Sequence, residues 1–156
     1  MVEGPARRMV KFAPVPEVHV VARVLLVDDD PTARLTLQTV LEAGGYSVES
    51  AASAAEAVQK LEEREYELVL SDLRMESPEA GYKVLAHARL MDYKPATALL
   101  KTHISARPNE NSVRQGLPVL IEPEDLPELL TKVASLISER AYKRLQRELR
   151  HAVVSS

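Results

Sequence analysis

Two kinds of hydrophobic pattern alternate along the chain from residue 23 onward. Short apolar runs predict buried strands, whereas apolar residues spaced three and four apart predict helices that cover them. Strands that alternate with helices in this way indicate an α/β protein with a parallel sheet covered on both faces. We predict strands at 23–27, 46–51, 66–71, 96–102 and 118–121, and helices at 31–43, from Ser53, near 81–91, and from about Glu124 to beyond Arg150.

The first predicted helix, 31–43, is bounded by residues that favour its two ends. Asp30 is a good N-cap and Pro31 suits the first helical position. Gly44 and Gly45 follow the last turn, where a left-handed cap is common. We expect the buried face of this helix to consist of Leu35, Leu37, Val40 and Leu41.

Carboxylates follow two of the predicted strands. The apolar run 24–27 leads directly into Asp28, Asp29 and Asp30, and the third predicted strand ends at Asp72. If these two strands are neighbours, their carboxyl ends meet in one crevice, where open α/β sheets place ligands. Like charges this close repel unless a cation is shared among them, and a set of oxygen ligands suits Mg²⁺. The alternative is that the acidic triplet merely complements a helix dipole.

The composition excludes several classes of protein. The 156 residues are 46% hydrophobic and 28% charged, which suits a globular domain and excludes wholesale disorder. Cysteine is absent, so disulfides, thiol catalysis and cysteine-ligated zinc are excluded. No apolar run approaches the ~20 residues of a membrane span, and the net charge of −3 disfavours nucleic-acid binding. We expect a soluble, cytoplasmic protein with no membrane span.

The pattern divides the chain into three parts. Residues 1–21 contain several prolines and no sustained period, so we expect a flexible leader; 22–137 form the domain, and 138–156 extend its last helix. The extension keeps a narrow apolar stripe flanked by basic residues, which predicts a homodimer contact or a linker to a partner. A basic helix for nucleic acid or anionic membrane is the alternative. The stripe consists of Tyr142, Leu145, Leu149 and Ala152.

Taken together, these motifs resemble the receiver domain of two-component response regulators over roughly residues 23–137. The likeness implies a flavodoxin-like, doubly wound, five-stranded parallel sheet in the order 2-1-3-4-5. It also implies a stand-alone receiver that signals by protein–protein contact, since no effector domain follows in this sequence. The residues that carry the likeness are Val24 to Pro31, Asp72-Leu73-Arg74-Met75, Gly81, Thr102 and Pro123.

The resemblance assigns a role to each site residue. Asp72 matches the phosphoacceptor, which takes a phosphoryl group from a histidine kinase or phosphotransfer protein and then signals to a downstream protein target. Asp28 and Asp29 match the acidic pair that holds Mg²⁺ together with Asp72, and the backbone carbonyl of Arg74 matches a further ligand. Thr102 matches the hydroxyl that bonds the phosphoryl oxygens. Such a domain catalyses its own phosphotransfer at most and is not a conventional enzyme.

The sequence departs from the family pattern near this site. Glu122 precedes a proline at the position where receivers carry a lysine, and Val119 replaces a frequent aromatic residue. Glu76 stands where a proline is usual, and Gly81 comes one residue late. Lys101 neighbours Thr102 but should point to the opposite face. Two functions therefore remain open: an Mg²⁺-dependent phosphotransfer switch, and a phosphorylation-independent pseudo-receiver that acts as an interaction or dimerisation module.

A second resemblance fits fewer residues. The pattern Asp28-x-Asp30-x-Thr32 also satisfies the nucleophile motif of haloacid-dehalogenase-like phosphatases, with Asp28 as nucleophile and Asp30 as acid/base. That family needs a downstream lysine and a late acidic pair, and neither is convincing here. His87 and His103 are expected on a helix face and in a loop rather than in a metal site.

Overall fold

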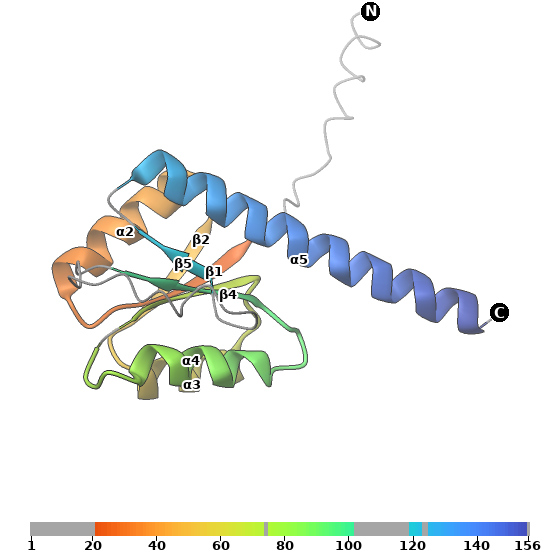
Figure 1. The fold of residues 1–156 in the computed structure, drawn as a ribbon, viewed down its shortest axis with the longest axis horizontal. Coiled ribbons are helices and arrows are strands. Elements are labelled where there is room, and N and C mark those ends of the chain that lie inside the picture. The colour runs from red at the N-terminus through yellow and green to blue at the C-terminus, as the bar shows by residue number, and fades with distance from the viewer. Residues whose placement is uncertain (1–20, 74, 102–118, 123–124, 156) are drawn as a thin grey trace, which may run out of the picture.

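A computed structural model describes residues 21–73, 75–101, 119–122 and 125–155. One parallel sheet lies between two layers of helices, with α2 and α5 on one face and α3 and α4 on the other (Figure 1). The strands are β1 (Arg23–Val27), β2 (Ser47–Ala51), β3 (Leu68–Asp72), β4 (Ala96–Leu100) and β5 (Val119–Ile121). The helices are α2 (Pro31–Ala43), α3 (Ala54–Glu63), α4 (Ala80–Arg89) and α5 (Leu126–Ser155).

The strand order is β2-β1-β3-β4-β5, and every neighbouring pair is parallel. This confirms the predicted doubly wound fold with its extended C-terminal helix. The register of β1 and β3 pairs Val27 with Ser71. The residues that follow, Asp28 and Asp72, therefore leave the same edge of the sheet side by side.

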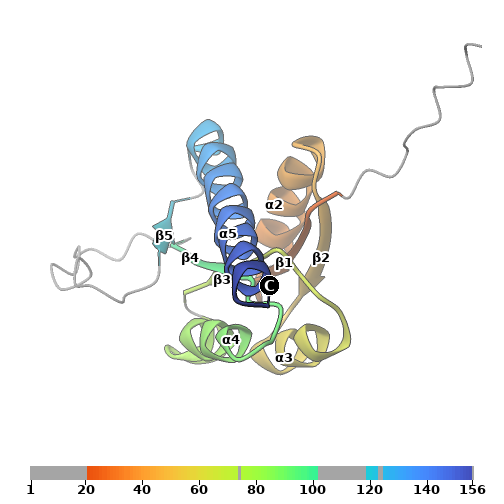
Figure 2. The same ribbon diagram turned by 90° about the vertical axis from the view of Figure 1, so that its right-hand side faces the viewer.

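The central strands are buried on both faces, which explains their uninterrupted apolar sequences. Leu26 and Leu70 belong to the core under α2 and α5, whereas Leu25 and Val69 belong to the core under α3 and α4. All four side chains are at most 1% exposed. Alternate residues of β1 and β3 thus hold the two helical layers to one sheet (Figure 2).

The helix ends follow the sequence signals closely. Asp30 accepts a hydrogen bond from the backbone N–H of Thr32 at 3.1 Å and caps α2, with Pro31 in its first turn. After α2, Gly45 takes a φ of 100°, a conformation in which other residues are strained. At α3, the Ser53 hydroxyl accepts from the backbone N–H of Glu56 at 3.1 Å, as expected for an N-cap.

Several element boundaries and one core residue differ from the prediction. The third strand begins at Leu68 rather than at residue 66, and α4 spans Ala80–Arg89 rather than 81–91. Leu35 was placed in the buried face of α2, but its side chain is 66% exposed. Leu37, two residues later, is buried. Residues two apart on a helix point in nearly opposite directions, so Leu35 and Leu37 cannot both face the sheet.

Helix α5 continues well past the edge of the sheet (Figure 1). Its first half packs on the domain through the fully buried Leu129 and Val133. Arg140 fastens it further along, because its guanidinium donates to the carbonyl oxygens of Lys94 at 2.9 Å and Tyr93 at 2.7 Å. Beyond Arg140 the helix extends to Ser155, and its large apolar side chains are exposed. The predicted leader, apart from Val21, lies outside the described residues.

Of the helices that the structure describes, none is both long enough and apolar enough to cross a membrane.

Candidate functional site

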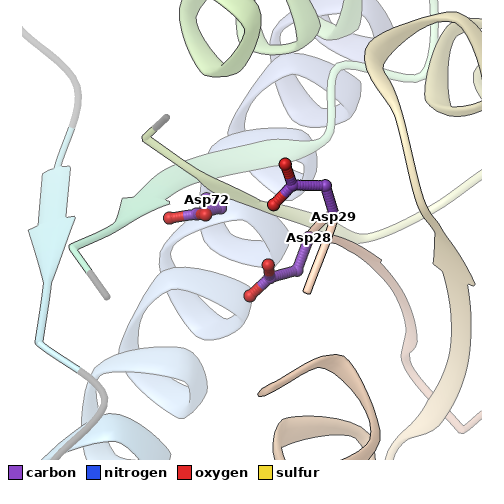
Figure 3. Close-up of side chains that lie close together, drawn as sticks. All are labelled: Asp28, Asp29 and Asp72. Atoms are coloured by element: carbon purple, nitrogen blue, oxygen red, sulfur yellow. The ribbon is translucent and has the colours of Figure 1, made fainter. Parts of the chain in front are cut away.

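Three carboxylates from two strand ends converge at the edge of the sheet. Oxygen atoms of Asp28, Asp29 and Asp72 all lie within 4.8 Å of one another (Figure 3). The pairing of β1 with β3 produces this arrangement, because it brings the ends of both strands level. The structure thus joins the first two residues of the acidic triplet with Asp72, as the sequence predicts. The third residue, Asp30, turns its side chain to the N-terminus of α2 instead.

Asp28 is held in place mainly through its backbone. Its N–H donates to the carbonyl of Ala51 at 3.1 Å, and its carbonyl accepts from Nη1 of Arg34 at 2.7 Å. The side chain is fully buried, and Oδ1 accepts from the backbone N–H of Asp30 at 3.0 Å. Oδ2 has no hydrogen-bond partner among the described residues. A buried carboxylate oxygen in this position suits a ligand that supplies positive charge.

The environment of Asp28 opposes its ionisation. Burial raises the pKa of this carboxyl from an ordinary value of 3.8 to about 6. The hydrogen bond from the Asp30 backbone partly lowers the pKa, and the neighbouring charges of Asp72, Asp29 and Asp30 raise it again. Desolvation and like-charge repulsion therefore act in the same direction. A cation bound between the carboxylates would remove both penalties.

Asp29 and Asp72 complete the cluster from different depths. Asp72 is 2% exposed at the end of β3, whereas the side chain of Asp29 is exposed to solvent. The cluster thus has a buried floor and an open side.

The start of α4 packs tightly over the end of β3. A methyl group at Gly81 would overlap the carbonyl oxygen of Asp72 and lie 2.9 Å from that of Leu73. The N–H of Leu73 donates to the carbonyl of Leu100 at 2.9 Å, which continues the pairing with β4 beyond Asp72. Only glycine permits this approach, so Gly81 fixes the backbone that carries the Asp72 carboxylate.

Two residues near the site were not singled out as supports from the sequence. Arg34 lies one turn into α2 and bonds the backbone of Asp28. Glu76, which was noted only as a departure from the family pattern, accepts from the backbone N–H of Ala54 at 3.0 Å. This bond ties the loop after β3 to the N-terminus of α3. Arg34 could have been found by its one-turn spacing from Asp30; no sequence signal marks the partner of Glu76.

The cluster fits Mg²⁺. All of its ligand atoms are oxygens, which this ion prefers, and ligands that share one Mg²⁺ at about 2.1 Å lie at most about 4.2 Å apart. Carboxylate oxygens already within 4.8 Å need little movement to meet that limit. The unpaired Oδ2 of Asp28 supplies a buried ligand atom.

The remaining predicted site residues lie elsewhere or outside the described residues. Glu122 is exposed after β5 and does not belong to the carboxylate cluster found among the described residues. His87 lies on α4, with Nε2 2.9 Å from Oε2 of Glu62. Thr102, the Arg74 carbonyl, the Val119 side chain and His103 are outside the described residues.

Comparison with known proteins identifies the family. The model of the response regulator receiver domain matches residues 24–134. The chain therefore belongs to the response regulator receiver family of two-component systems, and not to the haloacid-dehalogenase-like phosphatases that the Asp28-x-Asp30 pattern also suggested.

Relatives of known sequence are much longer than this chain. It is 38% identical over 96 residues to the gliding motility regulatory protein of Myxococcus xanthus, a match covering 61% of this chain and 12% of that protein. It is 32% identical over 124 residues to the transcriptional regulatory protein GlrR of Escherichia coli K12, covering 79% of this chain and 28% of that one. The chain thus spans less than a third of these two relatives.

Solved structures of receiver domains share the fold. A CheY-like receiver domain protein of Methanospirillum hungatei superposes with a TM-score of 0.66 at 26% identity, covering 79% of this chain and 98% of that one. The receiver domain of a Pseudomonas aeruginosa sensor histidine kinase gives a TM-score of 0.64 at 23% identity, covering 76% and 99%. That second structure has a magnesium ion coordinated in its active-site cleft.

The raised pKa of Asp28 predicts that metal-free protein loses stability as the pH rises. The protonated carboxyl is favoured in the folded state, so this stabilisation is complete below about pH 4 and disappears above about pH 6. The loss should be on the order of 2 to 3 kcal/mol. Urea unfolding between pH 4 and 7.5 in a chelator measures it. Asp28→Asn should flatten this dependence; parallel curves for the two proteins would contradict the prediction.

Proposed function

We propose that the protein is a phosphorylation-controlled receiver in which Asp72 accepts a phosphoryl group from a phosphohistidine of a sensor kinase or phosphotransfer protein. The observation that carries this proposal is the convergence of Asp28, Asp29 and Asp72 at one strand edge. Family membership supports the same role. A downstream protein would then recognise the phosphorylated domain. We place this exchange in the cytoplasm, as expected from the sequence.

The transfer itself requires little from the protein beyond positioning. A carboxylate oxygen of Asp72 attacks the phosphorus, a P–O bond forms and the P–N bond to the donor imidazole breaks; the leaving nitrogen keeps the electron pair and takes a proton from solvent. Gly81 and the pairing of β3 with β4 hold the backbone of Asp72 still during this displacement. The donor would approach from the side of Asp29, which is the exposed member of the cluster.

Magnesium would be held by Asp28, Asp29, Asp72 and the backbone carbonyl of Arg74. When bound, it would neutralise charge on the transferring phosphoryl group. The buried, unpaired Oδ2 of Asp28 and the magnesium in the Pseudomonas receiver domain support this assignment. Thr102 would supply the hydroxyl that bonds the phosphoryl oxygens and passes the change to the surrounding loop.

Phosphorylation of Asp72 can be tested with a small phosphodonor. Incubation with acetyl phosphate and Mg²⁺ should add one phosphoryl group to the intact mass, because the donor needs only an accessible carboxylate and a bound cation. Asp72→Asn should abolish the adduct, and a chelator should suppress it. If Mg²⁺ binds, as measured by calorimetry, and no adduct forms at any pH, Asp72 is not a phosphoacceptor.

Glu122 favours a second candidate function. It occupies the position at which receivers carry a lysine, and its carboxylate would repel a phosphoryl group rather than pair with it. A protein with this residue could keep the shape of a receiver while acting through protein contacts independently of phosphorylation. The intact aspartate cluster supports the switch; Glu122 supports the pseudo-receiver.

Substitution of Glu122 separates these two functions. If Asp72 is phosphorylated, Glu122→Lys should lengthen the lifetime of the adduct about two- to fivefold, because a cation near the phosphoryl oxygens replaces a repelling charge at an exposed position. Glu122→Gln should give a smaller gain, and Glu128→Lys on α5 serves as the matched control. Decay of the adduct by intact mass is the measurement. Equal lifetimes for the Glu122→Lys and Glu128→Lys proteins would show that Glu122 does not limit the switch.

We also propose that the protein forms a homodimer through the exposed end of α5, residues 141–155. Tyr142, Leu145 and Leu149 are 60%, 51% and 58% exposed, although such residues favour burial. They recur at three- and four-residue spacing, which is the pattern of a coiled-coil seam.

The homodimer can be tested by the mass of the protein in solution. Light scattering should report twice the mass of one chain for the natural sequence. The double substitution Leu145→Ser with Leu149→Ser should reduce it to one chain, because two Leu layers would no longer be buried. Lys143→Ser with Arg147→Ser, on the other side of the helix, should leave the dimer intact. A single-chain mass for the unaltered protein would overturn the proposal.

A further inference from the structure

Helix α5 has two apolar faces that point in nearly opposite directions. Val133 faces the sheet and is fully buried. Tyr142 follows two and a half turns later, at about 3.6 residues per turn, so it leaves the other side of the helix. Leu145 and Leu149 share the side of Tyr142. The second apolar face, which we call the outer stripe, is therefore largely turned away from the domain that carries it; Leu145 lies nearest to the domain, in a groove with Ala22. The outer stripe consists of Tyr142, Leu145, Leu149, Ala152 and Val153.

The basic residues of this segment lie on the other half of the helix. With about 100° per residue, Lys143, Arg144, Arg147 and Arg150 all fall more than about 100° from the centre of the outer stripe. A second helix can therefore lie along the stripe without approaching most of these charges. An anionic partner bound to the basic half would leave the stripe exposed.

We propose that the outer stripe pairs with that of a second copy in antiparallel orientation. This inference rests on the homodimer proposed above and adds its direction and register. Pairing Leu145 with Leu149 of the second copy places Tyr142 opposite Ala152 of that copy, and the two-fold axis repeats both layers. Each layer then has a similar total volume, either two leucines or one large and one small residue. A parallel pair would instead set tyrosine against tyrosine and alanine against alanine.

The charges at the edge of the stripe agree with this register. Arg144 and Glu148 form an ion pair within one helix, with Nε and Oε1 3.4 Å apart. In the antiparallel register, Glu148 of one copy is level with Gln146 of the other, and Arg144 of that copy lies two residues, or about 3 Å, further along the axis. The same pair can therefore also form between copies, on both sides of the two-fold axis. A parallel pair would bring Glu148 level with Glu148 of the second copy.

An open groove lies where residues 141–155 of α5 leave the domain, and it provides space for the end of the second helix. Ala22, Ile137, Ala141 and Leu145 contribute apolar lining to this groove between α5 and the start of β1. In the proposed register, residues 149–155 of the second copy lie level with residues 139–145, which include Ala141 and Leu145 of this groove. The groove and the outer stripe are continuous through Leu145.

Disulfide trapping tests the orientation of the two helices. Because the sequence contains no cysteine, only the introduced residues can form a disulfide. Tyr142→Cys and Ala152→Cys proteins are prepared separately and as an equilibrated mixture, then oxidised mildly. The antiparallel register predicts covalent dimers in the mixture, in about half of the pairs for statistical exchange, and almost none with either variant alone. The double variant should be trapped almost completely. Arg147→Cys, on the basic half, should remain monomeric under denaturing conditions.

Each other result overturns the antiparallel register. Trapping of each single variant alone would establish a parallel pair. A double-size mass by light scattering with no trapping in the mixture or the double variant would place the interface elsewhere. A single-chain mass would remove the homodimer altogether. Formation of the Asp72 phosphoryl adduct, measured on the same samples, reports that the domain is folded and tests the switch independently of the dimer.

Discussion

The structure depends on keeping two carboxylates buried beside each other at the ends of β1 and β3. Asp28 and Asp72 are placed there by the parallel register of these strands, and neither can move without a shift of the sheet. Their closeness costs free energy through desolvation and repulsion. The other residues of these strands are apolar on both faces, and their burial in two hydrophobic cores offsets that free-energy cost. The two cores thus hold one unfavourable electrostatic contact in place.

Several contacts around the cluster restrain its backbone. Arg34 directs its guanidinium to the carbonyl of Asp28, and Glu76 accepts from the backbone of α3. Gly81 lets α4 approach the carbonyl of Asp72. These contacts set positions, and Oδ2 of Asp28 has no hydrogen-bond partner among the described residues, which suits a site that receives positive charge with a ligand.

The sequence predicted the parts of the fold that depend on strong local signals. The apolar run Val24 to Val27 predicts a buried strand that ends in three aspartates. The closeness of Asp28 and Asp72 follows if strands one and three are neighbours. Asp30 and Ser53 marked helix starts because capping is a local interaction. The parallel order of the strands followed from the alternation of elements.

Features that depend on long-range geometry could not be predicted in this way. Leu35 is one of the regularly spaced apolar residues of its helix, but it does not point in the direction of Leu37 and Leu41. Only the packed helix shows that its side chain is exposed. The bond from Glu76 to Ala54 joins residues from different loops. Residue spacing alone predicts the stripe beyond Ser138, whereas the phase of the complete helix places it on the side opposite to the buried Leu129 and Val133.

Arg140 makes α5 stiffer than its packing alone would. By fastening the helix to the carbonyls of Tyr93 and Lys94, it makes residues 141–155 a stiff lever of about 22 Å at 1.5 Å per residue. A tilt of about 5° in the docked half would displace the far tip by about 2 Å over that length. A rearrangement too small to notice within the domain would thus be magnified where the helix ends.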